Sequence, residues 1–168
     1  MINPVVEIER ILKKQIDLYT RLSALEEEKS DAILARDGKK LERLSREQEE
    51  ILENVSHLET ARQTQIENYR VMNRLDDLPR EITLKDVVQS MNEDSSQRLL
   101  SLGIDLKRIL MRLAGLNETN EKLMRDNMEF FDMLLSGLRS TVSLRTGYSS
   151  RGVEEAKVAN PMIFNKMA

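Results

Sequence analysis

Few residues in this 168-residue chain can do acid–base, metal or nucleophilic chemistry. There is one histidine, His57, and no cysteine. A di-iron site in a helical bundle takes two Glu-x-x-His motifs, and the single candidate here reads Asn54-Val55-Ser56-His57. A zinc protease needs His-Glu-x-x-His and a serine triad needs a histidine oriented by a carboxylate, and neither can be assembled around His57. We therefore predict that His57 points to solvent and that the protein holds no metal and no cofactor.

Acidic runs at residues 26–28 and 47–50 are the other candidates for metal or acid–base chemistry. Basic residues accompany the acidic ones at helical spacing, as with Glu42 and Arg46. This pattern is typical of a solvated helix face with ion pairs between residues four apart. Since the chain also lacks a glycine-rich phosphate loop, we predict that it is not an enzyme.

The composition indicates long helices. The chain is 33% charged and 4% aromatic, with 6 Gly and 3 Pro, too few turn-forming residues for a sandwich or barrel of many strands. A net charge of −3 argues against general affinity for nucleic acid or anionic membrane. We find neither an apolar run of roughly 18 residues nor a signal-peptide pattern. These features predict a soluble cytoplasmic protein without membrane insertion.

Two seams, meaning rows of mainly apolar residues spaced alternately three and four apart, predict an antiparallel helical hairpin over about residues 5–76. Pro4 suits a first helical turn, and Asp37 followed by Gly38 suits a short turn with Asp37 as the next N-cap. Steps of three and four residues select Ile8, Ile11, Gln15, Leu18, Leu22, Leu25, Lys29 and Ala32, then Leu41, Leu44, Gln48, Ile51, Val55, Leu58, Arg62, Gln65, Tyr69 and Met72. Narrow seams of this period are typical of coiled coils.

A third helical region is predicted at residues 84–143, after a linker at 77–83 that contains Pro79. Thr83 and Asp86 form an approximate capping box, and residues 92–96 are either a loop or a fresh helix start. The seam continues at Leu99, Leu102, Leu106, Ile109, Leu113, Leu116, Asn120, Leu123, Asn127, Phe130 and Leu134. We expect an all-α fold: a helical bundle at residues 1–143, in which this long helix packs along the elongated hairpin, followed by a flexible tail at 144–168.

Two asparagines, Asn120 and Asn127, occupy equivalent positions of this third seam. A polar side chain in a seam lowers stability but sets register, because its hydrogen bonds are satisfied in only one alignment. The rival interpretation is a helix break at residues 115–119 with Asn117 as a cap. We favour a continuous helix, because the leucines keep phase across this segment.

Phenylalanine and methionine are concentrated in the C-terminal part of the chain. All three phenylalanines lie in the last 39 residues and six of the nine methionines in the last 58. Burial against the hairpin would explain why Phe130 and Leu134 are apolar. It does not explain the apolar residues Met128, Phe131 and Leu135. We therefore predict a binding surface here, since Met-rich surfaces adapt to irregular partners. The alternative is that all of these residues are core.

Several segments in order resemble the FlgN family of flagellar type III export chaperones. They are residues 14–29, 36–41, 47–52 and 58–62, the Leu-x-x-x-Asn-x-x-Asn-x-x-Leu pattern at 113–123, and Tyr148-Ser149-Ser150-Arg151-Gly152. The resemblance extends from residue 8 to about 152 and leaves the last 16 residues unmatched.

The resemblance implies a cytoplasmic bacterial chaperone that binds hook-associated (hook–filament junction) proteins of the FlgK and FlgL type. It would prevent their premature assembly and deliver them to the type III export apparatus. In this family the C-terminal region binds the substrate. Carried onto this chain, this implies partner-binding residues Met128, Phe131, Met133, Leu135, Leu138 and Tyr148. The alternative function is a structural coiled-coil adaptor, in which the C-terminal seam forms a homodimer.

Overall fold

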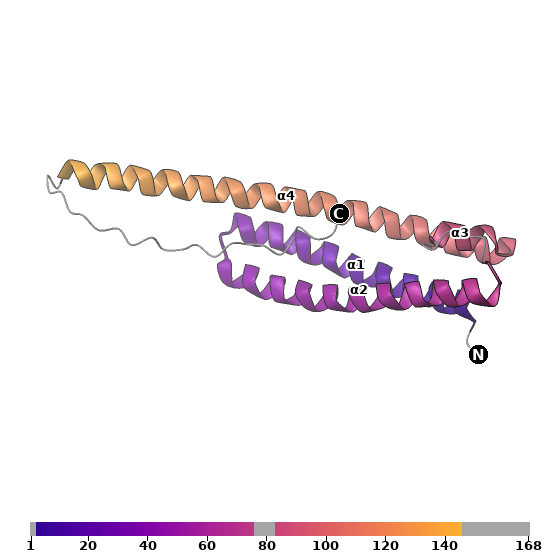
Figure 1. Cartoon of the computed structure of the whole chain (residues 1–168). Coiled ribbons are helices and arrows are strands. Elements are labelled where there is room, and N and C mark those ends of the chain that lie inside the picture. Colours follow the sequence, from indigo (N-terminus) through magenta and orange to yellow (C-terminus); the bar gives the residue numbers. More distant parts are fainter. Residues whose placement is uncertain (1–2, 76–82, 146–168) are drawn as a thin grey trace. The chain divides into compact units, whose positions relative to one another are not determined.

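The computed structural model describes residues 3–75 and 83–145, with side chains described as far as Gly137. This part of the chain contains four helices and no strand: α1 (Pro4–Leu34), α2 (Gly38–Met72), α3 (Leu84–Gln89) and α4 (Glu93–Arg145) (Figure 1). The predicted all-α class is confirmed. The predicted tail at 144–168 lies almost wholly outside the described residues.

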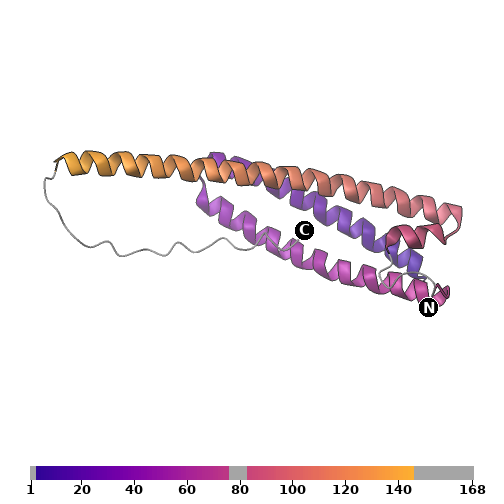
Figure 2. The ribbon, with the colours of Figure 1, turned by 45° about the horizontal axis from the view of Figure 1, so that its top comes forward.

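α1 and α2 form the predicted antiparallel hairpin (Figures 1 and 2). The turn is closed by hydrogen bonds from Asp37 N to Ala32 O (2.9 Å) and from Arg36 N to Ile33 O (3.1 Å). This is the Schellman arrangement, in which one residue after the helix adopts a left-handed conformation. Arg36 takes that conformation (φ 55°). Gly38, which we expected to help form the turn, is instead the first residue of α2.

The predicted helix caps are present. Asp37 accepts a hydrogen bond from Lys40 N at 3.0 Å, and Thr83 and Asp86 form a reciprocal capping box at α3. Asn92 Oδ1 accepts from Ser95 N at 3.0 Å, which shows that residues 92–96 are a fresh helix start. α4 then runs without a break through residues 115–119, so the continuous-helix interpretation is correct.

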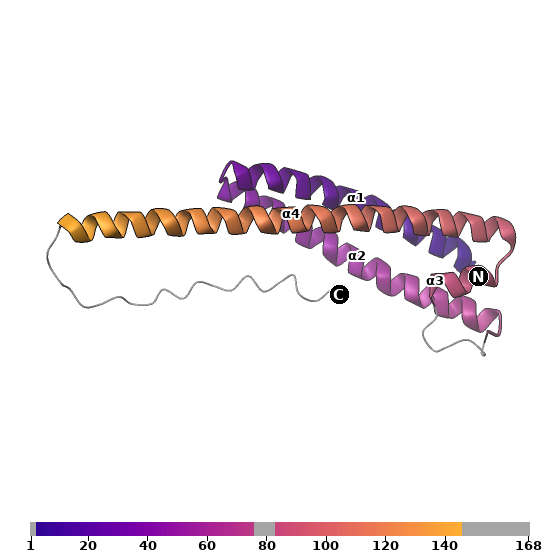
Figure 3. The ribbon, with the colours of Figure 1, turned by 90° about the horizontal axis from the view of Figure 1, so that it is seen from above.

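The chain divides into two units, Met1–Met128 and Glu129–Ala168. Within the first unit, α4 runs parallel to α1, because residues later in α4 pair with residues later in α1: Arg98 Nε lies 2.9 Å from Glu9 Oε1 and Arg112 Nη2 2.5 Å from Glu27 Oε1. The first unit is therefore an up–down–up bundle of α1, α2 and the first part of α4 (Figure 3). The described part of the second unit is the remainder of α4.

Two apolar clusters hold the first unit together. The base cluster joins all four helices through Ile8, Leu12, Ile66, Tyr69, Val87, Val88 and Leu99, with Leu102 and Leu106 packed against it. A second cluster contains Leu22, Ile51 and Val55, with Leu113 of α4 against it. The base cluster therefore brings α4 into contact with α1, α2 and α3, and the second cluster brings it into contact with α1 and α2.

The predicted seam of α2 is correct near the turn and loses phase toward the end of the helix, whereas the predicted α1 residues Ile8 and Ile11 are buried. Ile66 is buried in place of its neighbour Gln65, and Met72 is exposed. An untwisted helix has 3.6 residues per turn, so a strict 3.5-residue pattern loses phase over several turns. Here the actual helical period decides which side chains enter the core.

His57 and the Glu42–Arg46 pair are surface groups. His57 and its neighbour Glu53 are exposed, as predicted. Glu42 Oε1 and Arg46 Nη2 form the expected ion pair at 2.6 Å. Among the described residues there is no cluster of three potential metal ligands. No helix in the described part is sufficiently long and apolar to cross a membrane.

One partly exposed contact between α1 and α2 carries a pH prediction. Glu59 accepts hydrogen bonds from Arg62 Nε (2.9 Å) and Gln15 Nε2 (3.1 Å). The hydrogen bond from Arg62 chiefly, with a further one from Gln15, lowers the pKa of the Glu59 carboxyl below its ordinary value, against the opposing effect of burial. A carboxyl with a depressed folded pKa stabilises the fold above its unfolded pKa, and this stabilisation is lost as pH falls through the folded pKa.

We therefore expect Glu59→Gln to lower stability at neutral pH and to flatten the decline in stability below about pH 4.5. Urea unfolding followed by circular dichroism from pH 7 to pH 3 measures both effects. In an Arg62→Gln background the same substitution should change the pH dependence much less. An identical acid decline in the parent and in Glu59→Gln would contradict the prediction.

Candidate functional site

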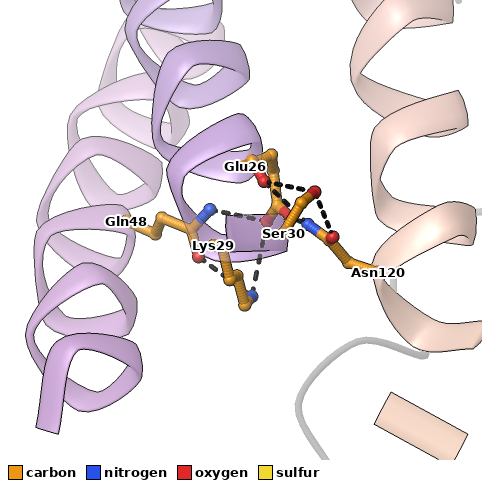
Figure 4. A network of polar contacts seen from close by, with 5 residues as sticks. All are labelled: Glu26, Lys29, Ser30, Gln48 and Asn120. Carbon is orange, nitrogen blue, oxygen red and sulfur yellow. Dashed lines mark hydrogen bonds and ion pairs between the residues drawn. The ribbon is translucent and has the colours of Figure 1, made fainter. Parts of the chain in front are cut away.

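Glu26 is a buried carboxylate that takes hydrogen bonds from three helices (Figure 4). The residue is only 2% exposed. Its Oε1 accepts from Gln48 Nε2 of α2 at 2.5 Å and lies 3.4 Å from Lys29 Nζ of α1, while Oε2 accepts from Asn120 Nδ2 of α4 at 2.6 Å. An isolated buried charge is costly, and this arrangement compensates it with a cation and amide donors.

The network corrects our interpretation of the first acidic run as a solvated face. Glu27 and Glu28 are exposed as predicted, whereas Glu26 is core. The missed signal was the set of polar residues that interrupt the three seams. Lys29, Gln48 and Asn120 each stand at a seam position, and all three surround the same carboxylate. Polar interruptions in several seams therefore indicated one shared buried group.

The seam asparagines of α4 bind α1 through its main chain as well as its side chains. Asn120 Nδ2 donates to Glu26 O at 2.8 Å, and Asn120 Oδ1 accepts from Ser30 Oγ at 2.5 Å (Figure 4). Asn127 Nδ2 donates to Ile33 O at 3.0 Å, and α1 ends one residue later, at Leu34. Ile33 O also accepts from Arg36 N in the turn (3.1 Å), so Asn127 adds a second hydrogen bond, from α4, to the last turn of α1. That the two asparagines set the register of α4 stays a prediction.

Exposed apolar side chains form a line along the later part of α4. Met124, Met128, Phe131 and Leu135, which we call the α4 ridge, are separated by four, three and four residues. This spacing puts them on one face of a helix. They are 44 to 62% exposed. Three of them are predicted partner-binding residues, and Met124 was missed although the same spacing identifies it.

Of the other predicted partner-binding residues, only the side chain of Met133 is described. Met133 is 63% exposed, but it is two residues from both Phe131 and Leu135, about 200° around a helix of 3.6 residues per turn. Leu138 lies in α4, but its side chain is outside the described part. Tyr148 lies outside the described residues altogether. Helical spacing therefore puts Met133 on a different face of α4 from the α4 ridge. The binding roles of Leu138 and Tyr148 stay predictions.

Two seam residues that we expected to be buried against the hairpin are exposed. Phe130 is 37% and Leu134 44% exposed. The Phe130 ring meets the Phe131 ring edge to face, with centroids 6.4 Å apart and planes at 68°. The seam pattern shows that these positions share a helix face, but it does not show where the partner helix ends. The exposed large apolar side chains described from residue 124 onward are therefore those of the α4 ridge together with Phe130, Met133 and Leu134.

The comparison with protein families gives one match. The family model described as FlgN protein matches residues 4–156, which include the hairpin, α3 and all of α4. No curated protein matched the chain, and no solved structure did. Because the match covers nearly the whole chain, the resemblance noted from the ordered segments is confirmed. The chain belongs to the FlgN family, a family of flagellar export chaperones.

Proposed function

We propose that this protein is a cytoplasmic chaperone for hook-associated proteins of the FlgK and FlgL type. It binds the newly made subunit through the α4 ridge, keeps it from assembling and delivers it to the type III export apparatus. Leu138 and Tyr148 extend the contact surface toward the C-terminus. Membership of the FlgN family supports the general role of a flagellar export chaperone. The α4 ridge is the surface to which we assign subunit binding.

The exposed α4 ridge is the observation that carries the proposal. Four large apolar side chains, each about half exposed, lie in line on one helix. An amphipathic segment of a subunit can lay its own apolar face against such a line, as in other helix-in-groove complexes. Each ridge residue then contributes roughly 1 kcal/mol from its remaining exposed area, since full burial of such a side chain is worth about 1.5–3 kcal/mol.

A surface of this kind suits temporary binding. Covering the apolar face of a subunit segment blocks the contacts by which that segment would assemble. Part of the contact energy is offset when a segment becomes ordered on binding. The affinity is therefore limited, and the subunit can be handed on at the export apparatus.

Binding measurements on ridge variants test the proposal. We expect the chain to co-purify with FlgK or FlgL of the same bacterium, and the double variant Phe131→Ala, Leu135→Ala to bind at least about 30-fold more weakly. Removal of residues 143–168 should also weaken binding. Calorimetric titration gives the affinities, and circular dichroism shows whether helix content is kept.

Met133→Ala is the matched control, because it removes an equally exposed apolar side chain from the opposite face of α4. Its affinity should equal that of the unaltered chain. Unchanged binding by the ridge double variant would overturn the assignment of the site. A stable homodimer that is disrupted by Phe130→Asp and has no affinity for either subunit would favour the adaptor function instead.

A further inference from the structure

We infer that Asn117 is a positioning residue: it donates to the buried Glu26 carboxylate beside Asn120, and the two amides together fix where α4 lies along α1. All three residues belong to the first unit. The inference concerns the attachment of α4 to the hairpin, and it holds whichever subunit the protein binds.

Asn117 stands inside α4, so it does not cap a helix. Its side chain is partly buried. It precedes Asn120 by three residues, a spacing that puts two side chains on the same face of a helix, and Asn120 binds α1. With its nitrogen toward α1, the Asn117 amide lies 3.0 Å from Glu26 Oε1 and 3.3 Å from Glu26 Oε2.

The chemistry of the carboxylate selects this orientation of the Asn117 amide. An ionised carboxylate only accepts hydrogen bonds, whereas an amide has a donating nitrogen and an accepting oxygen that a half-turn of the side chain exchanges. With its oxygen toward Glu26, Asn117 would have only acceptors around that oxygen and only donors around its nitrogen. Turning the nitrogen toward Glu26 satisfies both ends of the amide.

The Glu26 carboxylate also has an acceptor position left for this donor. Its two oxygens offer about four such positions. Gln48, Lys29 and Asn120 supply three donors (Figure 4). Because the Glu26 side chain is only 3% exposed, water has little access to the fourth position. Asn117 therefore completes the set of donors around the buried charge.

Two amides three residues apart distinguish the observed position of α4 from positions one helical turn away. If α4 moved by one turn, about 5.4 Å, only one of the two amides would remain beside Glu26. In one direction Leu113 would take the place of the lost amide, and in the other direction Met124 would. Neither side chain can donate to a carboxylate, and a buried charge with fewer partners is costly.

The orientation of the Asn117 amide can be measured in the unaltered chain by nuclear magnetic resonance. We expect its side-chain NH₂ protons, identified by their loss in Asn117→Ala, to exchange with water at least about tenfold more slowly than those of Asn68. Asn68 is an exposed asparagine of α2. Equal exchange rates for the two side chains would overturn the inference.

Paired substitutions test whether Asn117 acts through Glu26. We expect Asn117→Ala to raise the equilibrium constant for unfolding at least about tenfold. In a Glu26→Ala background the same substitution should change it less than about threefold. Asn68→Ala is the matched control, because it makes the same change in helix propensity at an exposed position. Equal effects of Asn117→Ala in the two backgrounds would contradict the inference, and the exchange measurement decides it even if Glu26→Ala does not fold.

Spin labels measure where α4 lies along α1. Because the chain has no cysteine, Val6→Cys and Met111→Cys, both at exposed side chains, place one label on each helix. Electron–electron double resonance should give one distance between the labels in this background and after Asn68→Ala. The double substitution Asn117→Ala, Asn120→Ala should add a second population displaced by up to about 5 Å. An unchanged distance distribution would show that the two amides do not fix the position of α4.

Discussion

Glu26→Ala is expected to lower the free energy of unfolding by about 3–5 kcal/mol, the usual effect of removing one partner of a buried ion pair. The substitution deprives Lys29, Gln48 and Asn120 of a common acceptor in a site where the Glu26 side chain is 3% and the Lys29 side chain 13% exposed. Asn120 Nδ2 keeps the main-chain oxygen of residue 26 (2.8 Å) and Lys29 Nζ keeps Gln48 Oε1 (3.2 Å), whereas Gln48 Nε2 loses the carboxylate. A buried donor that loses its acceptor costs roughly 1–3 kcal/mol. The missing side chain also leaves a cavity at the junction of three helices.

Urea unfolding followed by circular dichroism measures the effect, and Glu27→Ala is the matched control. Glu27 is the next residue and also pairs with an α4 residue, Arg112, but the two side chains are 52% and 58% exposed. Exposed ion pairs contribute at most about 1 kcal/mol. Equal losses for the two variants would show that the buried network does not stabilise the bundle.

Leu99→Ala is expected to cost about 2–5 kcal/mol, because it removes a side chain from the centre of the base cluster. Leu99 is 0% exposed and contributes to the cluster from α4, together with residues of α1, α2 and α3. The variant should loosen α4 from the hairpin, so amide hydrogen exchange should accelerate in α4 more than in α1 or α2.

Leu100→Ala provides the comparison for this change, since it is the same substitution one residue later at a side chain that is 47% exposed. We expect it to cost less than about 1 kcal/mol. Should Leu100→Ala prove as destabilising as Leu99→Ala, α4 would have to turn a different face toward the hairpin. Urea unfolding of both variants under the same conditions makes this comparison.

Glu26→Ala and Leu99→Ala test two different ways in which α4 is attached to the hairpin. At the base, α4 is held by apolar burial around Leu99. Further along, Asn120 and Asn127 bind groups of α1 through hydrogen bonds. Apolar burial contributes more stability but specifies register weakly, whereas amide hydrogen bonds are satisfied in one alignment only. We therefore expect losses at Leu99 to act on stability and losses at Asn120 to act on the alignment of α4.

Local features of the fold could be predicted from sequence because they depend on residues close together in the chain. Asp37 and Thr83 cap helices that begin within three residues of them. The third seam keeps its spacing through residues 115–119, and α4 is continuous there. The use of Arg36 in the left-handed turn position was not predicted, because glycine is the usual residue there and Gly38 stood nearby.

By itself, the sequence determined the helices, the hairpin, the family resemblance and the apolar character of the later part of α4, since each of these depends on local spacing and residue type. Only the tertiary structure decided that Glu26 is buried while Glu27 is exposed, and that Phe130 and Leu134 are exposed. Burial depends on which other helix lies opposite a side chain and on where that helix ends. Seam spacing within one helix carries neither piece of information.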